Sequence, residues 1–266
     1  MAAQSVSPVR RVRHRLRTHV SEHPVVYLPF ARRKYPGPSP EVISRQTELV
    51  IDGYTRSAAT FAVYALQLAQ DKPVRLAHHL HAPAQLIEAA RNDVPALVLI
   101  REPKGAILSQ LIREPGVALR DALVAYSRFY SRLLPYRGKF VVGDFEEVTR
   151  DFGSVIRRLN ARYGTSFAEF AHTEANMREC FDLIKQRGTL SKTLLGFESG
   201  VVTLSQLRRE QEASPRQLKL LDAREAWIPS AEREGSKSAL EAQWLRPDLA
   251  KARDRAQVIY QMFLVG

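Results

Sequence analysis

Three short segments of the sequence gather the side chains best suited to bind phosphate or to move a proton. The first is a loop at residues 53–61, Gly-Tyr-Thr-Arg-Ser-Ala-Ala-Thr-Phe, between the apolar run at residues 49–51 and an Ala-rich helical stretch. Such a loop exposes backbone N–H groups at a helix N-terminus, where an anion binds favourably. Arg56, Ser57 and Thr60 add side-chain donors, so the loop is typical of a phosphate site, although a plain strand-to-helix turn could share its pattern.

The loop lacks the ending of a Walker A motif, which is Gly-Lys followed by Ser or Thr. The corresponding residues are Ala58, Ala59 and Thr60, without a lysine. A P-loop kinase is therefore disfavoured, although it stays open as an alternative. Alanine in place of glycine at position 58 matters if that residue must adopt a positive φ. A protein that binds a nucleotide or a partner without catalysis also stays open.

A second candidate anion site follows the apolar run at residues 96–100. Arg101 ends that run, Pro103 suits the first turn of a helix, and Ser109 lies two turns further along. This spacing predicts a guanidinium and a hydroxyl on the same side, which suits a second phosphate group.

Histidines form the third segment, at the end of a strand predicted over residues 74–80. They are His78, His79 and His81. The ordinary pKa of histidine lies near neutrality, which suits a general base. Strand alternation puts His79 and His81 on one face if the strand persists. Buried structural histidines remain an alternative, and a metal site is disfavoured because no Cys or His group stands at ligand spacing elsewhere.

The elements that must position these segments alternate along the chain. Apolar runs predict strands at residues 49–51, 74–80, 96–100 and 140–142, and apolar stripes predict helices at residues 59–70, 84–90, 103–112, 119–133 and 152–163. We expect a three-layer α/β/α fold with a central parallel sheet and a ligand site at the carboxyl ends of the strands. Further helices are predicted at residues 176–186, 204–212, 215–227 and 247–264. For the polar stretch at about residues 170–229, a lid or acceptor-binding region and a set of peripheral helices are both open interpretations.

The two loops together resemble those of the sulfotransferases that use phosphoadenosine phosphosulfate (PAPS) as sulfuryl donor, and most closely small bacterial members, over about residues 50–164. The first loop of that family reads Pro-Lys/Arg-Ser-Gly-x-Thr, and its second motif is Arg-x-Pro with a serine eight residues after the arginine. Arg56, Ser57 and Thr60 match the first, and Arg101 and Ser109 match the second. The family's Pro, Gly and polar residue are replaced by Thr55, Ala58 and Ala59.

The resemblance implies a P-loop NTPase-like sulfotransferase fold and transfer of a sulfuryl group from PAPS to an acceptor hydroxyl without a metal. The loop Thr55-Arg56-Ser57-Ala58-Ala59-Thr60 would hold the 5′-phosphosulfate, and Arg101 with Ser109 would hold the 3′-phosphate. Arg56 would also stabilise charge on the bridging oxygen. The other product would be adenosine 3′,5′-bisphosphate.

The resemblance also assigns the proton transfer and a closing loop. His79 matches the family's general base best, with His81 close behind. Phe145-Glu146-Glu147 resembles an aromatic-acidic segment of the family. A basic loop that closes over the 3′-phosphate has its counterpart at residues 229–237, where Arg233 and Lys237 are the candidates and a solvated helix start is the alternative.

Composition narrows the class of protein. The chain has 266 residues, 45% hydrophobic and 26% charged, which is ordinary for a globular protein. We expect a basic N-terminal lead-in at residues 1–46 and a single α/β domain at residues 47–266. Cys180 is the only cysteine, which excludes an intrachain disulfide and indicates a cytoplasmic protein. No apolar run approaches the roughly 18 residues that a transmembrane helix needs.

Charge favours anionic partners without choosing among them. The net charge is +12, and the lead-in has no acidic residue before Glu22. A membrane-touching or nucleic-acid-binding arm is one interpretation of the lead-in, and a short surface helix before a loop with Pro36, Pro38 and Pro40 is the other. Nucleic acid is disfavoured because aromatic residues do not interleave with the charges. The sequence leaves the acceptor open among small molecules, glycans and lipids, and it does not indicate the oligomeric state.

Overall fold

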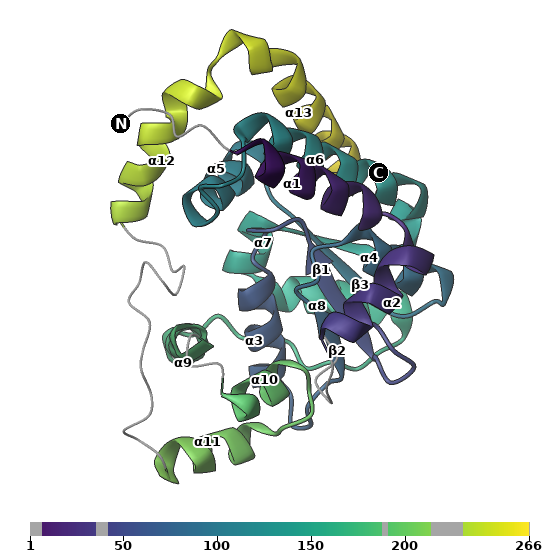
Figure 1. Ribbon diagram of the computed structural model, residues 1–266. Helices are drawn as coiled ribbons and strands as arrows, with labels where there is room; N and C mark the ends of the chain where they lie inside the picture. The colour runs from purple at the N-terminus through teal and green to yellow at the C-terminus, as the bar shows by residue number, and fades with distance from the viewer. Residues whose placement is uncertain (1–6, 36–41, 188–190, 214–230, 266) are drawn as a thin grey trace.

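The computed structural model describes residues 7–35, 42–187, 191–213 and 231–265 (Figure 1). At its centre is a parallel sheet of four strands in the order β2-β1-β3-β4. The strands are β1 (Leu49–Gly53), β2 (Leu76–His78), β3 (Ala96–Ile100) and β4 (Val141–Asp144). The central strands β1 and β3 are buried at every position, as strands covered on both faces must be. The expected parallel α/β fold is confirmed.

Helices cover both faces of this sheet. On one face Ile51 and Leu99 share a hydrophobic cluster with α3 (Ala59–Ala69), α8 (Phe152–Tyr163) and α9 (Glu174–Gln186). On the other face Val50 and Val98 pack with α4 (Pro83–Arg91), α5 (Pro103–Arg113), α6 (Leu119–Leu133) and α13 (Ala250–Val265). Neighbouring strand residues thus enter different clusters, because their side chains alternate between faces. The three layers are those expected from the sequence.

The remaining elements surround these layers. They are α1 (Pro8–Val20), α2 (Pro24–Lys34), the short 3-10 helices η1 (Leu134–Lys139) and η4 (Pro247–Leu249), α7 (Phe145–Arg150), α10 (Lys192–Glu198), α11 (Leu204–Ala213) and α12 (Ala231–Trp244). The helix predicted at residues 215–227 and the prolines at positions 36, 38 and 40 lie outside the described residues. Among the described residues, no helix has both the length and the apolar content that crossing a bilayer requires.

The N-terminal helices pack on the rest of the molecule through charge and through apolar contacts. Asp121 of α6 accepts hydrogen bonds from Arg11 and Arg15 of α1, at 3.0 and 2.9 Å. Just after α1, the buried carboxylate of Glu22 pairs with Arg128 and with Arg132 of α6. Residues of α2 belong to the same cluster as the sheet: Tyr27, Leu28 and Ala31. The helices of the expected lead-in therefore pack against α6 and the core.

Candidate functional site

The loop between β1 and α3 has an unusual backbone. Arg56 and Ala58 adopt left-handed conformations, with φ of 71° and 70°. This conformation costs a non-glycine residue roughly 1–2 kcal/mol. The N–H groups of Ser57, Ala58 and Ala59 donate to no other described residue. The loop therefore offers a row of N–H donors at the start of α3, as a bound anion would require.

Tyrosines of α6 hold the strand ends beneath this loop. The Tyr54 N–H donates to the Tyr130 hydroxyl at 3.2 Å, and that hydroxyl donates to the Leu99 carbonyl at 2.8 Å. A Cβ at Gly53 would lie 2.2 Å from the Leu99 oxygen, so only glycine fits where β1 meets β3. These contacts therefore fix the position of the backbone at which the loop begins.

The two predicted phosphate sites meet in space. The Arg56 Nε donates to the Ser109 hydroxyl at 3.2 Å, and an Arg101 Nη donates to the Arg56 carbonyl at 3.3 Å. The Arg101 guanidinium also stacks on the Phe145 ring, 3.7 Å from its centroid, while Tyr126 donates to the Arg101 carbonyl. Cationic stacking of this kind fixes the guanidinium plane. Arg56, Arg101 and Ser109 therefore form one connected group.

The hydroxyl of Ser57 is buried in the same loop. Ser57 is 1% exposed, and its Oγ makes no hydrogen bond of ordinary geometry to a described residue, although it lies beside the Tyr130 hydroxyl. A buried hydroxyl without a good partner is costly, which makes it receptive to a ligand oxygen.

The histidine segment departs from the expected strand. β2 ends at His78 and not at Leu80, and His79 and His81 adopt positive φ of 57° and 49°. The strand also begins late, since the Gln67 amide takes up the backbone N–H and carbonyl of Val74. Strand alternation therefore does not place His79 and His81, yet the two rings lie 5.9 Å apart, edge to face.

His81 is oriented by the end of β1. Its Nδ1 lies 2.9 Å from the Gly53 carbonyl, which can only accept, so in the neutral ring Nδ1 carries the proton and Nε2 the lone pair. Asp52, fully buried, accepts from the His81 N–H and from Gln85. No described residue hydrogen-bonds to the His81 Nε2. Sequence reasoning missed Asp52, whose signal is a lone carboxylate inside an apolar strand.

His79 is occupied on both ring nitrogens. Its Nε2 lies 3.0 Å from the Thr60 hydroxyl, and its Nδ1 lies 2.6 Å from the Nδ1 of His78. Burial, reinforced by the cation of Arg187, lowers the pKa of His79 well below its ordinary value. Burial also lowers the pKa of His78 to about 4. Both rings are therefore neutral at pH 7.

The structure brings a carboxylate to these histidines that the sequence did not indicate. Potential ligand atoms of His78, His79 and Glu198 lie within 4.8 Å of one another. Glu198, at the end of α10, already pairs with Arg187 at 2.6 Å and accepts from the Tyr64 hydroxyl. A metal ion at this position would have to displace the Arg187 cation.

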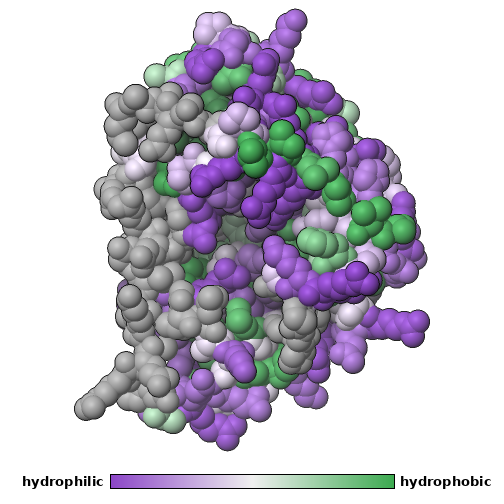
Figure 2. All heavy atoms as spheres, in the orientation of Figure 1, coloured by the Kyte–Doolittle hydropathy of each residue, from purple (hydrophilic) through white to green (hydrophobic). Residues whose placement is uncertain are grey.

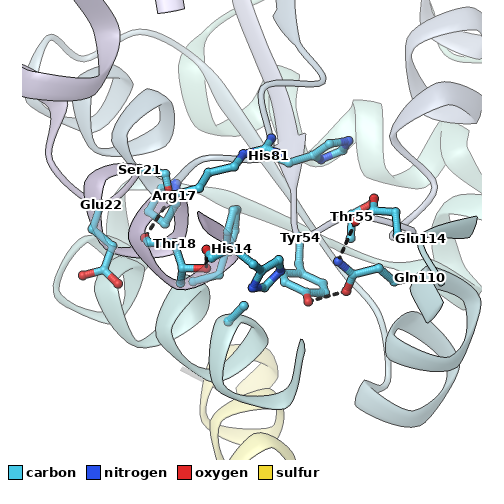
Figure 3. Close-up of a pocket in the computed structure, with 13 residues that line it drawn as sticks. His14, Arg17, Thr18, Ser21, Glu22, Tyr54, Thr55, His81, Gln110 and Glu114 are labelled. Atoms are coloured by element: carbon cyan, nitrogen blue, oxygen red, sulfur yellow. Dashed lines mark hydrogen bonds between the residues drawn. The ribbon is translucent and has the colours of Figure 1, made fainter. Parts of the chain in front are cut away.

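A cavity of about 100 Å³ opens beside the loop, between α1, α5 and α6 (Figure 3). Tyr54 and Thr55 form one side, with the Tyr54 hydroxyl donating to Gln110 at 2.6 Å. His81 reaches the cavity from the β2 end, whereas His79 is absent from its lining. Arg17 extends from α1 toward His81 (Figure 3). The sequence did not predict that α1 lines this cavity, because α1 is distant from the other lining residues along the chain.

The predicted closing loop near the C-terminus is a helix. Residues from Ala231 onward form α12, which packs against α5, so the expectation of a loop at residues 229–237 is wrong for its described part. Residues 229 and 230 and the Arg233 side chain lie outside the description, whereas Lys237 is half-buried. Lys104 of α5 pairs with Glu241 of α12.

Comparisons with known proteins give one structural similarity. No family model matches the sequence, and no curated protein matches it. Among solved structures, the chain is similar to the crystal structure of mouse sulfotransferase SULT7A1 complexed with PAP, at 14% sequence identity and a TM-score of 0.38. The match covers 76% of this chain and 91% of that one. The chain is thus similar in structure to a sulfotransferase, and this similarity assigns no residue roles.

Proposed function

We propose that this chain is a PAPS-dependent sulfotransferase. The observation that carries the proposal is the contact between the two sequence motifs. The unpartnered N–H groups of residues 57–59 lie in the loop whose Arg56 contacts Ser109 and Arg101. A donor with phosphate groups at both ends, such as PAPS, needs two anion sites of this kind on neighbouring strand ends.

The loop would bind and orient the donor. Its N–H groups and the hydroxyls of Ser57 and Thr60 would hold the 5′-phosphosulfate, and Arg101 with Ser109 would hold the 3′-phosphate. As the S–O bond to the phosphate breaks, its electron pair stays on the bridging oxygen. The Arg56 guanidinium and the loop N–H groups would stabilise the charge that develops there.

His81 is the better placed general base of the two candidates. The acceptor oxygen would attack sulfur while its proton passes to the His81 Nε2, which carries the lone pair in the neutral ring. The Gly53 carbonyl fixes the orientation of the ring, and Asp52 holds the His81 backbone through its N–H group. His79 would first have to leave His78 or Thr60. The acceptor would enter the cavity beside Tyr54.

A nucleotide-binding relative without catalysis is the second candidate. One observation favours it: Arg56 and Ala58 hold the loop in a conformation that glycine adopts at lower cost. Such a protein would bind adenosine 3′,5′-bisphosphate and transfer no sulfuryl group from PAPS.

Thermal unfolding with adenosine 3′,5′-bisphosphate tests the donor site, with ATP and Mg²⁺ as the comparison. At about 100 times Kd a ligand stabilises the native state by roughly 2.7 kcal/mol, which corresponds to a midpoint shift of about 5–10 °C for a domain of this size. Arg101→Ala should lose this shift. Arg150→Ala, in an exposed ion pair with Glu146 on α7, is the matched control and should keep it.

Turnover with PAPS and a panel of hydroxyl acceptors separates the two candidates. We expect His81→Ala to keep the bisphosphate shift and lose turnover, with His79→Ala less affected. A shift without turnover for any acceptor favours the non-catalytic relative. A shift with ATP and Mg²⁺ alone, or with neither ligand, would overturn the donor assignment.

A further inference from the structure

The α1 helix carries its apolar stripe on the outside. Val9, Val12 and Leu16 lie within one 60° sector of the helix and are 75%, 64% and 63% exposed. None of the residues of α1 is buried. An amphipathic helix in a globular protein normally turns such a stripe toward the core. Here the outward stripe is available to something other than the core.

The inner face of α1 explains this orientation. Arg11 and Arg15 bind Asp121, which is only 3% exposed, and His14 and Thr18 face the cavity. Two guanidinium groups on one inward carboxylate hold the polar face against α6. The outward position of the apolar stripe is therefore a consequence of specific contacts.

The α2 helix continues the apolar stripe. Val25, Val26 and Phe30 are 82%, 60% and 62% exposed, while other residues of α2 are buried in the core. Figure 2 shows hydrophobic atoms in a band that follows α1 and α2 in Figure 1, bordered by hydrophilic atoms. We call these six exposed side chains and the basic residues beside them the α1–α2 surface.

Positive charge borders this band. The exposed cations of the two helices include Arg10, Arg13, Arg32, Arg33 and Lys34. Arg13 and Arg33 form no ion pair with another described residue. The only acidic residue in α1, in α2 and between them is Glu22, which is buried and paired with two arginines. The charge around the stripe is therefore uncompensated by any carboxylate of its own helices.

We propose that the α1–α2 surface docks on an anionic lipid bilayer, with both helices lying in the interfacial plane. An apolar face bordered by arginine and lysine is the pattern of helices that insert shallowly between lipid head groups. Anionic lipid attracts each basic residue near it by about 1 kcal/mol. A nucleic acid would use the cations and leave the valines, Leu16 and Phe30 in water.

The proposal does not depend on sulfuryl transfer, because lipid binding requires neither donor nor acceptor. Docking would, however, place the cavity close to the membrane, since α1 separates the two. The expected cytoplasmic location would give the surface access to the anionic cytoplasmic leaflet.

Flotation of the full chain with lipid vesicles tests the proposal. We expect binding to phosphatidylcholine vesicles that contain about 30% phosphatidylserine, weaker binding to phosphatidylcholine alone, and loss of binding as salt rises. Leu16→Ser with Phe30→Ser should lower partitioning at least roughly tenfold, since each removes an apolar side chain from the interface. Arg13→Glu with Arg33→Glu should lower it to a similar extent.

A matched control distinguishes this surface from general hydrophobicity. Val258 and Met262 of α13 are 57% and 52% exposed, so Val258→Ser with Met262→Ser removes comparable surface elsewhere. This variant should float like the parent, and every variant should keep the parental thermal midpoint. The proposal is overturned if the parent does not float with anionic vesicles, or if the control and the α1–α2 variants lose binding equally.

Discussion

At the scale of single residues, the strained backbone of the first loop can be tested directly. Ala58 has φ of 70° and ψ of 20° at the N-cap of α3. Ala58→Gly should raise the free energy of unfolding by about 0.5–1 kcal/mol, because relief of the left-handed alanine exceeds the added entropy of the unfolded chain. Chemical denaturation measures this change.

The neighbouring alanine provides the control. Ala59 begins α3 in a right-handed conformation, so Ala59→Gly gains no strain relief and should lower the free energy of unfolding by up to about 1 kcal/mol. Equal losses in both variants would show that the loop does not hold Ala58 in the left-handed region in solution.

At the scale of elements, α1 depends on a single carboxylate of α6. Burial acts to raise the pKa of Asp121, but hydrogen bonds from Arg11 and Arg15 outweigh it and leave the pKa below its ordinary value. The stability that these two hydrogen-bonded ion pairs contribute is therefore present above the ordinary pKa of an aspartate. It is lost as the pH falls through the lowered pKa of Asp121. Asp121→Asn should remove most of this contribution to stability at neutral pH.

We expect Asp121→Asn to increase amide hydrogen exchange in α1 and to lower stability by about 1–2 kcal/mol, as loss of charged hydrogen bonds does. Asp248→Asn is the control, because Asp248 pairs with Arg246 on the exposed surface and such pairs contribute little. Unchanged exchange in α1 would mean that other contacts hold the helix.

At the scale of the whole molecule, a buried neutral histidine makes stability depend on pH. His78 has a folded-state pKa of about 4, whereas in the unfolded chain it is near 6.5. Between these values the unfolded state binds more protons, so stability falls as pH falls. From pH 7 to pH 4, this residue alone lowers the free energy of unfolding by roughly 3 kcal/mol.

Replacement of His78 by a residue without a titrating ring should flatten that part of the curve. Urea unfolding of the parent and of His78→Gln at several pH values measures it. His19→Gln, on the exposed face of α1, is the matched control. The prediction fails if the parent and the His78 variant show the same slope between pH 4 and 6.5.

The sequence by itself determined the layered architecture. Short apolar runs between helical stripes predicted β1, β3, α3, α5 and α6 close to their observed bounds, because burial on both faces leaves a local signature. It also predicts which loops bind anions, since Arg101 and Ser109 stand at a readable spacing, and this assignment stays a prediction. The strand at residues 74–80 was predicted too long, because the Gln67 side chain replaces a backbone partner of Val74.

The tertiary structure alone decided which groups meet. Asp52 binds the backbone N–H of His81, Glu198 reaches His78, and α1 forms a wall of the cavity, in each case through contacts between residues distant in the chain. Only the fold shows that the stripe of Val9, Val12 and Leu16 faces outward, since periodicity reports that a helix has an apolar face without saying where that face points. Local patterns reflect the burial of each segment, whereas the chemistry of the site and of the surface depends on long-range contacts.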